Sequence, residues 1–158
     1  MNINDHTTPE KLERYAFMWS IARMVIASVS LFFGAVPIAL RIFDYQLGFF
    51  VQLAWLISGI ASIYLGYMWY KNKKSIFGAN HQNDTIFFLI LVITGINLGY
   101  TITGYNFGMS FAYSLPLTWL IFKLTALGYL YVAYNLWKKW KAHDEHLFSK
   151  EEKVSASE

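Results

Sequence analysis

Four long apolar stretches constrain the fold of this chain more than any other feature of its sequence. They run from about residues 17–40, 48–70, 85–103 and 115–137. A helix needs about 20 mostly apolar residues to cross a hydrocarbon core of roughly 30 Å, and each stretch meets that requirement. The sequence therefore predicts an all-α fold: an integral membrane bundle of four transmembrane helices, forming one multi-pass domain over residues 1–158.

Composition supports a membrane class. The chain is 56% hydrophobic and only 15% charged, whereas a soluble domain carries roughly 25% charged residues. Four such helices inside a soluble protein would leave almost no polar sequence for its outer surface. The sequence also contains no cysteine, which excludes disulfides, thiolate metal sites and cysteine nucleophiles.

Basic residues predict the orientation of the bundle. They occur in the N-terminal segment, in the connection over residues 71–84 and at the start of a tail over residues 138–158. In the first connection Arg41 is offset by Asp44, and the connection over residues 104–114 has no charge. Lysine and arginine accumulate in cytoplasmic loops. We therefore expect both termini, including the tail, to lie in the cytoplasm, with the protein in a bacterial inner (cell) membrane.

Small residues suggest how the helices approach one another. The third stretch carries a G-x-x-x-G pattern at Gly95 and Gly99, and the second carries Ser58, Ser62 and Gly66 at steps of four. Membrane helices associate through such small residues and through interhelical hydrogen bonds. Two interpretations stay open: packing within the bundle, or association with helices of another chain.

Two cations, Lys123 and Arg23, interrupt the apolar stretches. An ionised group near the centre of a membrane helix costs at least about 2.5–3.5 kcal/mol, and the four stretches contain no acid to pair with it. Arg23 could reach Asp84 at the edge of one loop, and Lys123 could reach Asp44 at the edge of another. Alternatively, each side chain points back along its helix toward the lipid head groups.

Lys123 has two further options. Trp119 lies four residues earlier, on the same helical face, where its ring can attract the ammonium group. Without nearby acids, Lys123 and Arg23 could instead bind an anionic group.

The third stretch also has a polar face, formed by Thr94, Asn97 and Thr101. It predicts either interhelical hydrogen bonds, worth about 0.6 kcal/mol each, or one wall of a polar path. We group six residues as the candidate polar or anion site: Lys123, Arg23, Asn97, Thr94, Thr101 and Trp119.

Groups for catalysis or cofactor binding are scarce. The four histidines, His6, His81, His143 and His146, lie outside the apolar stretches, so they cannot supply bis-histidine haem ligation inside the bundle. His143 and His146 alone are too few for a closed zinc site. We predict no catalytic residue, no metal, no cofactor and no nucleic-acid partner.

These observations favour a non-catalytic integral membrane protein: an accessory, anchor or assembly subunit of a membrane complex. Its partners would be the lipid bilayer and either other membrane subunits or further copies of itself. The alternative is a small oligomeric transporter or channel for a polar or anionic substrate. A membrane enzyme acting on a lipid-soluble substrate is a more distant third hypothesis.

Overall fold

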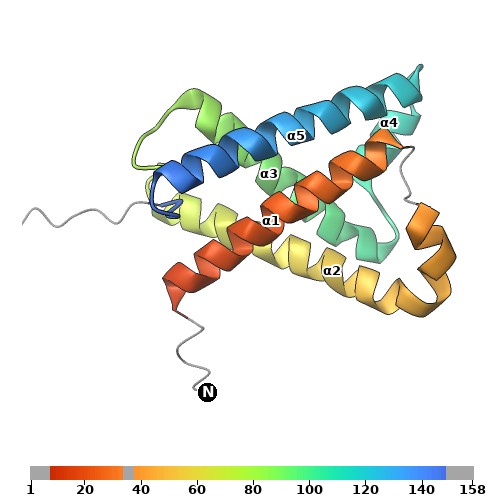
Figure 1. Ribbon diagram of the computed structural model, residues 1–158, viewed down its shortest axis with the longest axis horizontal. Helices are drawn as coiled ribbons and strands as arrows, with labels where there is room; N and C mark the ends of the chain where they lie inside the picture. Colours follow the sequence, from red (N-terminus) through yellow and green to blue (C-terminus); the bar gives the residue numbers. More distant parts are fainter. Residues whose placement is uncertain (1–7, 34–37, 149–158) are drawn as a thin grey trace, which may run out of the picture.

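The computed structural model describes residues 8–33 and 38–148, with the backbone alone over residues 38–47 (Figure 1). The described chain is helical and contains no strand, which confirms the all-α prediction. Two short segments, a 3₁₀ turn and a helix of seven residues, join the third and last long helices. The elements in chain order are α1 (Pro9–Phe32), α2 (Ile38–Lys71), α3 (Gln82–Tyr100), η2 (Thr101–Thr103), α4 (Phe107–Tyr113) and α5 (Thr118–Ala142).

The four long helices run alternately in opposite directions. In Figure 1, α1 and α5 lie side by side and antiparallel, and α2 and α3 form a second antiparallel pair against them. The start of α1, the loop between α2 and α3, and the end of α5 therefore gather at one end of the bundle, which we call the terminal end. The opposite end, which includes the end of α1, α4 and the start of α5, is the α4 end.

The start of α1 follows from its capping residues. Thr8 is the N-cap, and its side-chain oxygen accepts a hydrogen bond from the Lys11 backbone N–H at 3.4 Å. Pro9 occupies the first helical position, where its missing N–H costs nothing.

The end of α1 differs from the prediction. The helix stops at Phe32 instead of continuing to about residue 40, and α2 starts at Ile38 instead of near residue 48. Pro37 lies between the two helices in the sequence. Proline lacks a backbone N–H and disfavours the helical conformation in the residue before it, so a single helix across this position was a wrong expectation.

The last long helix is displaced from the predicted stretch at both ends. α5 begins at Thr118, directly after Leu117, whose φ of 59° is left-handed. It extends past residue 137 to Ala142, so the first residues of the predicted tail are helical. Beyond the helix, Leu147 and Phe148 are buried against the bundle. Residues 149–158 of the predicted tail lie outside the described residues.

The apolar core is concentrated toward the terminal end. Phe17 and Trp140 pack with ring centroids 5.2 Å apart, which ties α1 to α5. The side chains of both are almost completely buried. Other core residues include Met24, Leu65, Phe88, Leu91 and Leu136.

Glycines allow close contact between α2 and α3. A Cβ atom added to Gly99 would lie 2.5 Å from the Cα of Gly59, and one added to Gly95 would lie 1.8 Å from the Ser62 hydroxyl oxygen. Both glycines of the G-x-x-x-G pattern are thus used inside this chain, as the intramolecular interpretation predicted.

Three segments are long and apolar enough to cross a membrane: Pro9–Phe32, Gly48–Lys71 and Gln82–Thr103. Their outer faces carry many large apolar side chains that other parts of the described chain leave uncovered, such as Ile26, Ile60 and Ile93. These features fit an integral membrane protein.

Candidate functional site

Arg23 lies inside the bundle. Its side chain projects from α1 toward α3, and only 7% of the residue is exposed. Nη2 donates to the Leu91 carbonyl oxygen at 2.7 Å, and Nη1 donates to the Thr94 hydroxyl at 3.3 Å. The absence of a side chain at Gly95 leaves room for the guanidinium, because a Cβ there would lie 3.0 Å from Nη2. Two of the three Arg23 nitrogens therefore donate to neutral acceptors within the protein, whereas its buried Nε has no hydrogen-bond partner among the described residues.

The hypothesis that Arg23 pairs with Asp84 is wrong. Asp84 is only 2% exposed, and both of its carboxylate oxygens accept hydrogen bonds from Lys139 Nζ, at 2.5 and 2.7 Å. Asp84 also lies in the first turn of α3, where the helix dipole stabilises a negative charge. This pair joins the start of α3 to the end of α5 at the terminal end of the bundle.

The polar face of α3 divides between two separate networks. Thr94 bonds with Arg23, whereas Asn97 Nδ2 donates to Asn106 Oδ1 at 2.9 Å. Asn106 in turn donates to the Thr101 hydroxyl at 3.2 Å and caps α4 through the Met109 N–H. Asn97 and Thr101 therefore stabilise the turn that leads from α3 into α4, which agrees with the hydrogen-bonding interpretation of this face.

Lys123 lies in a different environment, at the α4 end. Its residue is exposed, and its Nζ atom is 5.6 Å from the centroid of the Trp119 ring and 5.5 Å from that of Phe32. The predicted contact with Trp119 is confirmed. No described carboxylate forms an ion pair with Lys123, and the side chain of Asp44, its predicted alternative partner, lies outside the described residues.

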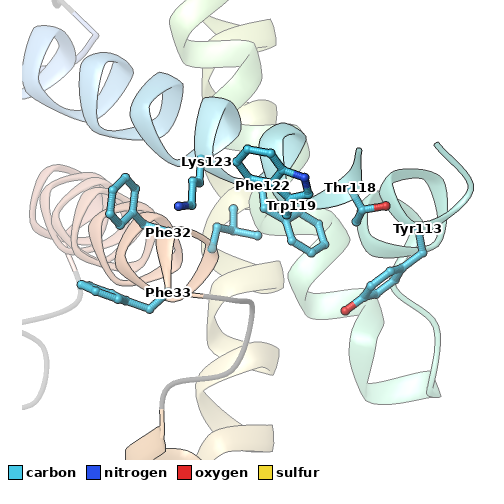
Figure 2. Close-up of a pocket in the computed structure, with 8 residues that line it drawn as sticks. Phe32, Phe33, Tyr113, Thr118, Trp119, Phe122 and Lys123 are labelled. Carbon is cyan, nitrogen blue, oxygen red and sulfur yellow. The ribbon is translucent and has the colours of Figure 1, made fainter. Parts of the chain in front are cut away.

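A groove surrounds Lys123 between the end of α1, α4 and the start of α5 (Figure 2). Its volume is about 520 Å³. Figure 2 shows the Lys123 amine beside the ring of Phe32, with Trp119 close to it on α5. The lining is mainly aromatic and aliphatic, and comprises Leu31, Phe32, Phe33, Tyr113, Thr118, Trp119, Phe122 and Lys123. Such a lining suits an amphiphilic molecule that carries a negative charge.

Sequence reasoning missed a set of contacts at the terminal end. One Glu13 carboxylate oxygen accepts hydrogen bonds from the backbone N–H groups of Leu147 and Phe148, at 2.9 and 3.2 Å. Glu145 forms ion pairs with Arg14 and Lys141. The hydrogen bond from Lys141, together with the charge of Arg14, lowers the pKa of Glu145 below its ordinary value of 4.5.

These contacts depend on a turn after α5 that no sequence motif predicted. Asp144 and Glu145 both have positive φ, which reverses the chain after α5. The His143 ring packs on Phe77 with centroids 5.1 Å apart. Across the described residues, no group of three histidine, cysteine or acidic side chains gathers as metal ligands would.

The six predicted site residues therefore fall into three places. Arg23 and Thr94 meet inside the bundle, Asn97 and Thr101 meet beside α4, and Lys123 and Trp119 meet in the groove. No protein-family model, curated protein or solved structure matches this chain. We therefore base the functional proposal on the geometry of these three places.

Proposed function

We propose that the chain is a four-span protein of a bacterial inner membrane, with both termini in the cytoplasm. The fourth span is α5, which at 1.5 Å per residue is about 37 Å long and so exceeds the hydrocarbon thickness. It lies antiparallel to α1, and its outward side chains are large and apolar, including Leu124, Leu127 and Leu130. Its lysine cluster falls at the terminal end, as the bias of positive charge toward the cytoplasm predicts.

Within that membrane, we propose a non-catalytic function as an accessory, anchor or assembly subunit of a larger complex. The observation that carries this proposal is that several internal polar groups form hydrogen bonds between helices. Arg23, Ser28 and Asn97 all bond to neighbouring helices or their connections, with Ser28 donating to the Ala126 carbonyl at 2.6 Å. Such bonds hold helices together, whereas a transport path requires polar side chains that face water.

The outward faces supply the surface for partners. Large apolar side chains remain exposed along all four long helices. Contiguous exposed apolar surface of this kind serves contact with lipid or with other membrane chains. Other membrane subunits or further copies of the chain would therefore pack against these faces, beside the lipid.

Purification of the full tagged chain in a mild detergent tests the subunit proposal. We expect other membrane proteins to co-purify in a fixed stoichiometry, which mass spectrometry of the purified complex would show. A Gly95→Leu variant controls for carry-over of abundant proteins, because true partners should be lost when the contact between α2 and α3 is disrupted. A homodimer alone, or a monomer, would contradict the proposal.

A small oligomeric transporter is the second candidate, and the groove at Lys123 is the observation that favours it. A cation without a described carboxylate partner suits an anionic substrate. A Lys123→Leu variant separates the two functions. Transport predicts loss of substrate flux at normal expression, whereas the subunit function predicts normal activity of the complex in cells.

A further inference from the structure

We propose that the groove around Lys123 binds the phosphate of an anionic phospholipid, with the Lys123 ammonium group as its counter-ion. The inference goes beyond the subunit function and rests on the proposed four-span placement, with the α4 end of the bundle at a membrane surface. It rests on the charge, position and shape of the groove.

Charge is the first observation. Among the side chains that the structure describes at the α4 end, Lys123 carries the only formal charge. Its described neighbours are the rings of Phe32 and Trp119, which attract a cation through their faces but leave the ammonium protons without hydrogen-bond acceptors. A phosphate oxygen supplies both an acceptor and the missing negative charge. A Lys or Arg near an anionic membrane surface contributes roughly a fivefold increase in affinity per residue.

The position of Lys123 allows its side chain to extend toward the depth of a lipid head group. It lies five residues after the start of α5 at Thr118, which corresponds to about 7–8 Å along the helix axis. A long helical side chain points back toward the N-terminus of its helix, and this direction is toward the α4 end. Trp119, whose residue is 60% exposed, lies on the same turn, as expected for an aromatic residue at a membrane interface.

The shape of the groove favours a lipid over a small anion. The rings of Phe32, Phe33 and Trp119 form walls on either side of the Lys123 amine (Figure 2). A phospholipid would place its phosphate at Lys123 and lay its glycerol and upper acyl carbons along these rings. An inorganic phosphate ion makes no contact with these apolar walls, so it gains only the charge interaction.

Lipid titration of the purified full chain tests the proposal. Native mass spectrometry in a mild detergent would compare phosphatidylglycerol, which is anionic, with phosphatidylcholine, which has a phosphate but no net charge. Inorganic phosphate is the third probe. We expect phosphatidylglycerol to bind more tightly than phosphatidylcholine, and inorganic phosphate not to displace it at equal concentration.

Three variants locate the site. Lys123→Gln should weaken phosphatidylglycerol binding about fivefold, the share of one cation, whereas Lys123→Arg should stay within about twofold. Lys138→Gln, which removes the same charge at the terminal end, should leave the affinity of the groove unchanged. Size-exclusion profiles and thermal unfolding curves would establish that all three variants remain folded.

A spectroscopic measurement gives a second, independent readout. Phosphatidylglycerol with brominated acyl chains should quench part of the tryptophan emission, and Trp119→Phe should remove a measurable part of that quenching. Lys123→Gln should raise the lipid concentration at which the quenching reaches half of its maximum. Loss of lipid binding in the isolated chain would not affect the co-purification result, so this proposal and the subunit function fail separately.

Several results would overturn the lipid site. One is unchanged phosphatidylglycerol binding by Lys123→Gln, and another is an equal loss with Lys138→Gln, which would indicate general attraction to a basic protein. Equally tight phosphatidylcholine binding, or displacement by inorganic phosphate at equal concentration, would also contradict it. If Lys123→Gln releases a co-purifying protein but binds lipid normally, the groove is a protein interface.

Discussion

The interior around Arg23 and the groove around Lys123 present the same sequence signal in two different structural settings. Both are cations in apolar stretches without an acid nearby. Arg23 is 7% exposed and donates to two acceptors on α3, whereas Lys123 is exposed beside two aromatic rings. The comparison teaches that the surrounding helices, rather than the isolated stretch, decide whether such a cation is buried and hydrogen-bonded or left exposed.

The chemistry of the two side chains fits these settings. Guanidinium has five N–H donors in a planar fork, so neutral acceptors on one neighbouring helix can satisfy two of its nitrogens. The helix backbone at Leu91 and the hydroxyl at Thr94 provide them. Ammonium is a compact charge on a flexible stem, which suits an exposed position beside the rings of Phe32 and Trp119.

The largest loss of stability is expected at Gly95, where α2 and α3 are in close contact. Gly95→Ala should lower the free energy of unfolding by about 1–3 kcal/mol, because the added methyl group overlaps Ser62 and crowds Arg23. Gly128→Ala is the matched control, since a Cβ at Gly128 has nothing within 4 Å, and it should cause no loss. Reversible unfolding in detergent measures both variants. Equal stabilities would mean that α2 and α3 do not pack as closely as described.

The next largest difference in stability is expected when arginine and lysine are exchanged at the two positions. Arg23→Lys should lower the free energy of unfolding by about 1–2 kcal/mol, since lysine retains the charge but cannot bond in the same fork geometry. Lys123→Arg should change it by less than about 0.5 kcal/mol, as for an exposed side chain. The same unfolding assay compares them. A neutral Arg23→Lys variant would show that the bonds to Leu91 and Thr94 do not stabilise the fold.

A smaller loss of stability is expected at the second polar network of α3, in which Asn97 bonds with Asn106. Asn106→Ala should cost about 1 kcal/mol, because it removes the N-cap of α4 and the bond with Asn97. A double-mutant cycle should show coupling of at least about 0.5 kcal/mol between Asn97 and Asn106, whereas Asn97 and Thr94 should behave additively. Strong coupling between Asn97 and Thr94 would instead support one continuous polar path along the helix.

The smallest effect concerns pH at the terminal end. The hydrogen bond from Lys141 and the charge of Arg14 hold the pKa of Glu145 below its ordinary value of 4.5. Its interactions therefore stabilise the fold fully above that value and are lost as the pH falls through the lowered pKa. Stability of the wild type should decline slightly more than that of Glu145→Gln over this acidic range. If the stabilities of the two proteins fell equally with decreasing pH, the interactions of Glu145 would not contribute to stability.

The sequence allowed the local features to be predicted. Apolar length indicated the helices, and spacing indicated the contact of Lys123 with Trp119. Gly95 and Gly99 indicated a close helix contact, although Gly59, the neighbour of Gly99, was not recognised. The contact of Lys123 with Trp119 depends on residues within one helical turn, where spacing alone fixes the geometry.

The remaining features depend on which helices become neighbours. Phe32 reaches Lys123 only because α1 lies beside α5, and Leu147 reaches Glu13 only because the chain reverses after α5. Asp84 pairs with Lys139 instead of Arg23 because the end of α5 lies beside the start of α3. Such partners are far apart in the sequence, and no spacing rule connects them.

Cysteine accessibility in intact cells tests most directly whether α5 crosses the membrane, with the loop between α2 and α3 and the C-terminal region on the same side. The chain contains no cysteine, so single substitutions at Asn80, Ser110 and His146 provide unique labelling sites. A membrane-impermeant maleimide should label Ser110→Cys in intact cells, but label Asn80→Cys and His146→Cys only after permeabilisation. Labelling of Ser110→Cys and His146→Cys from the same side would contradict the four-span bundle.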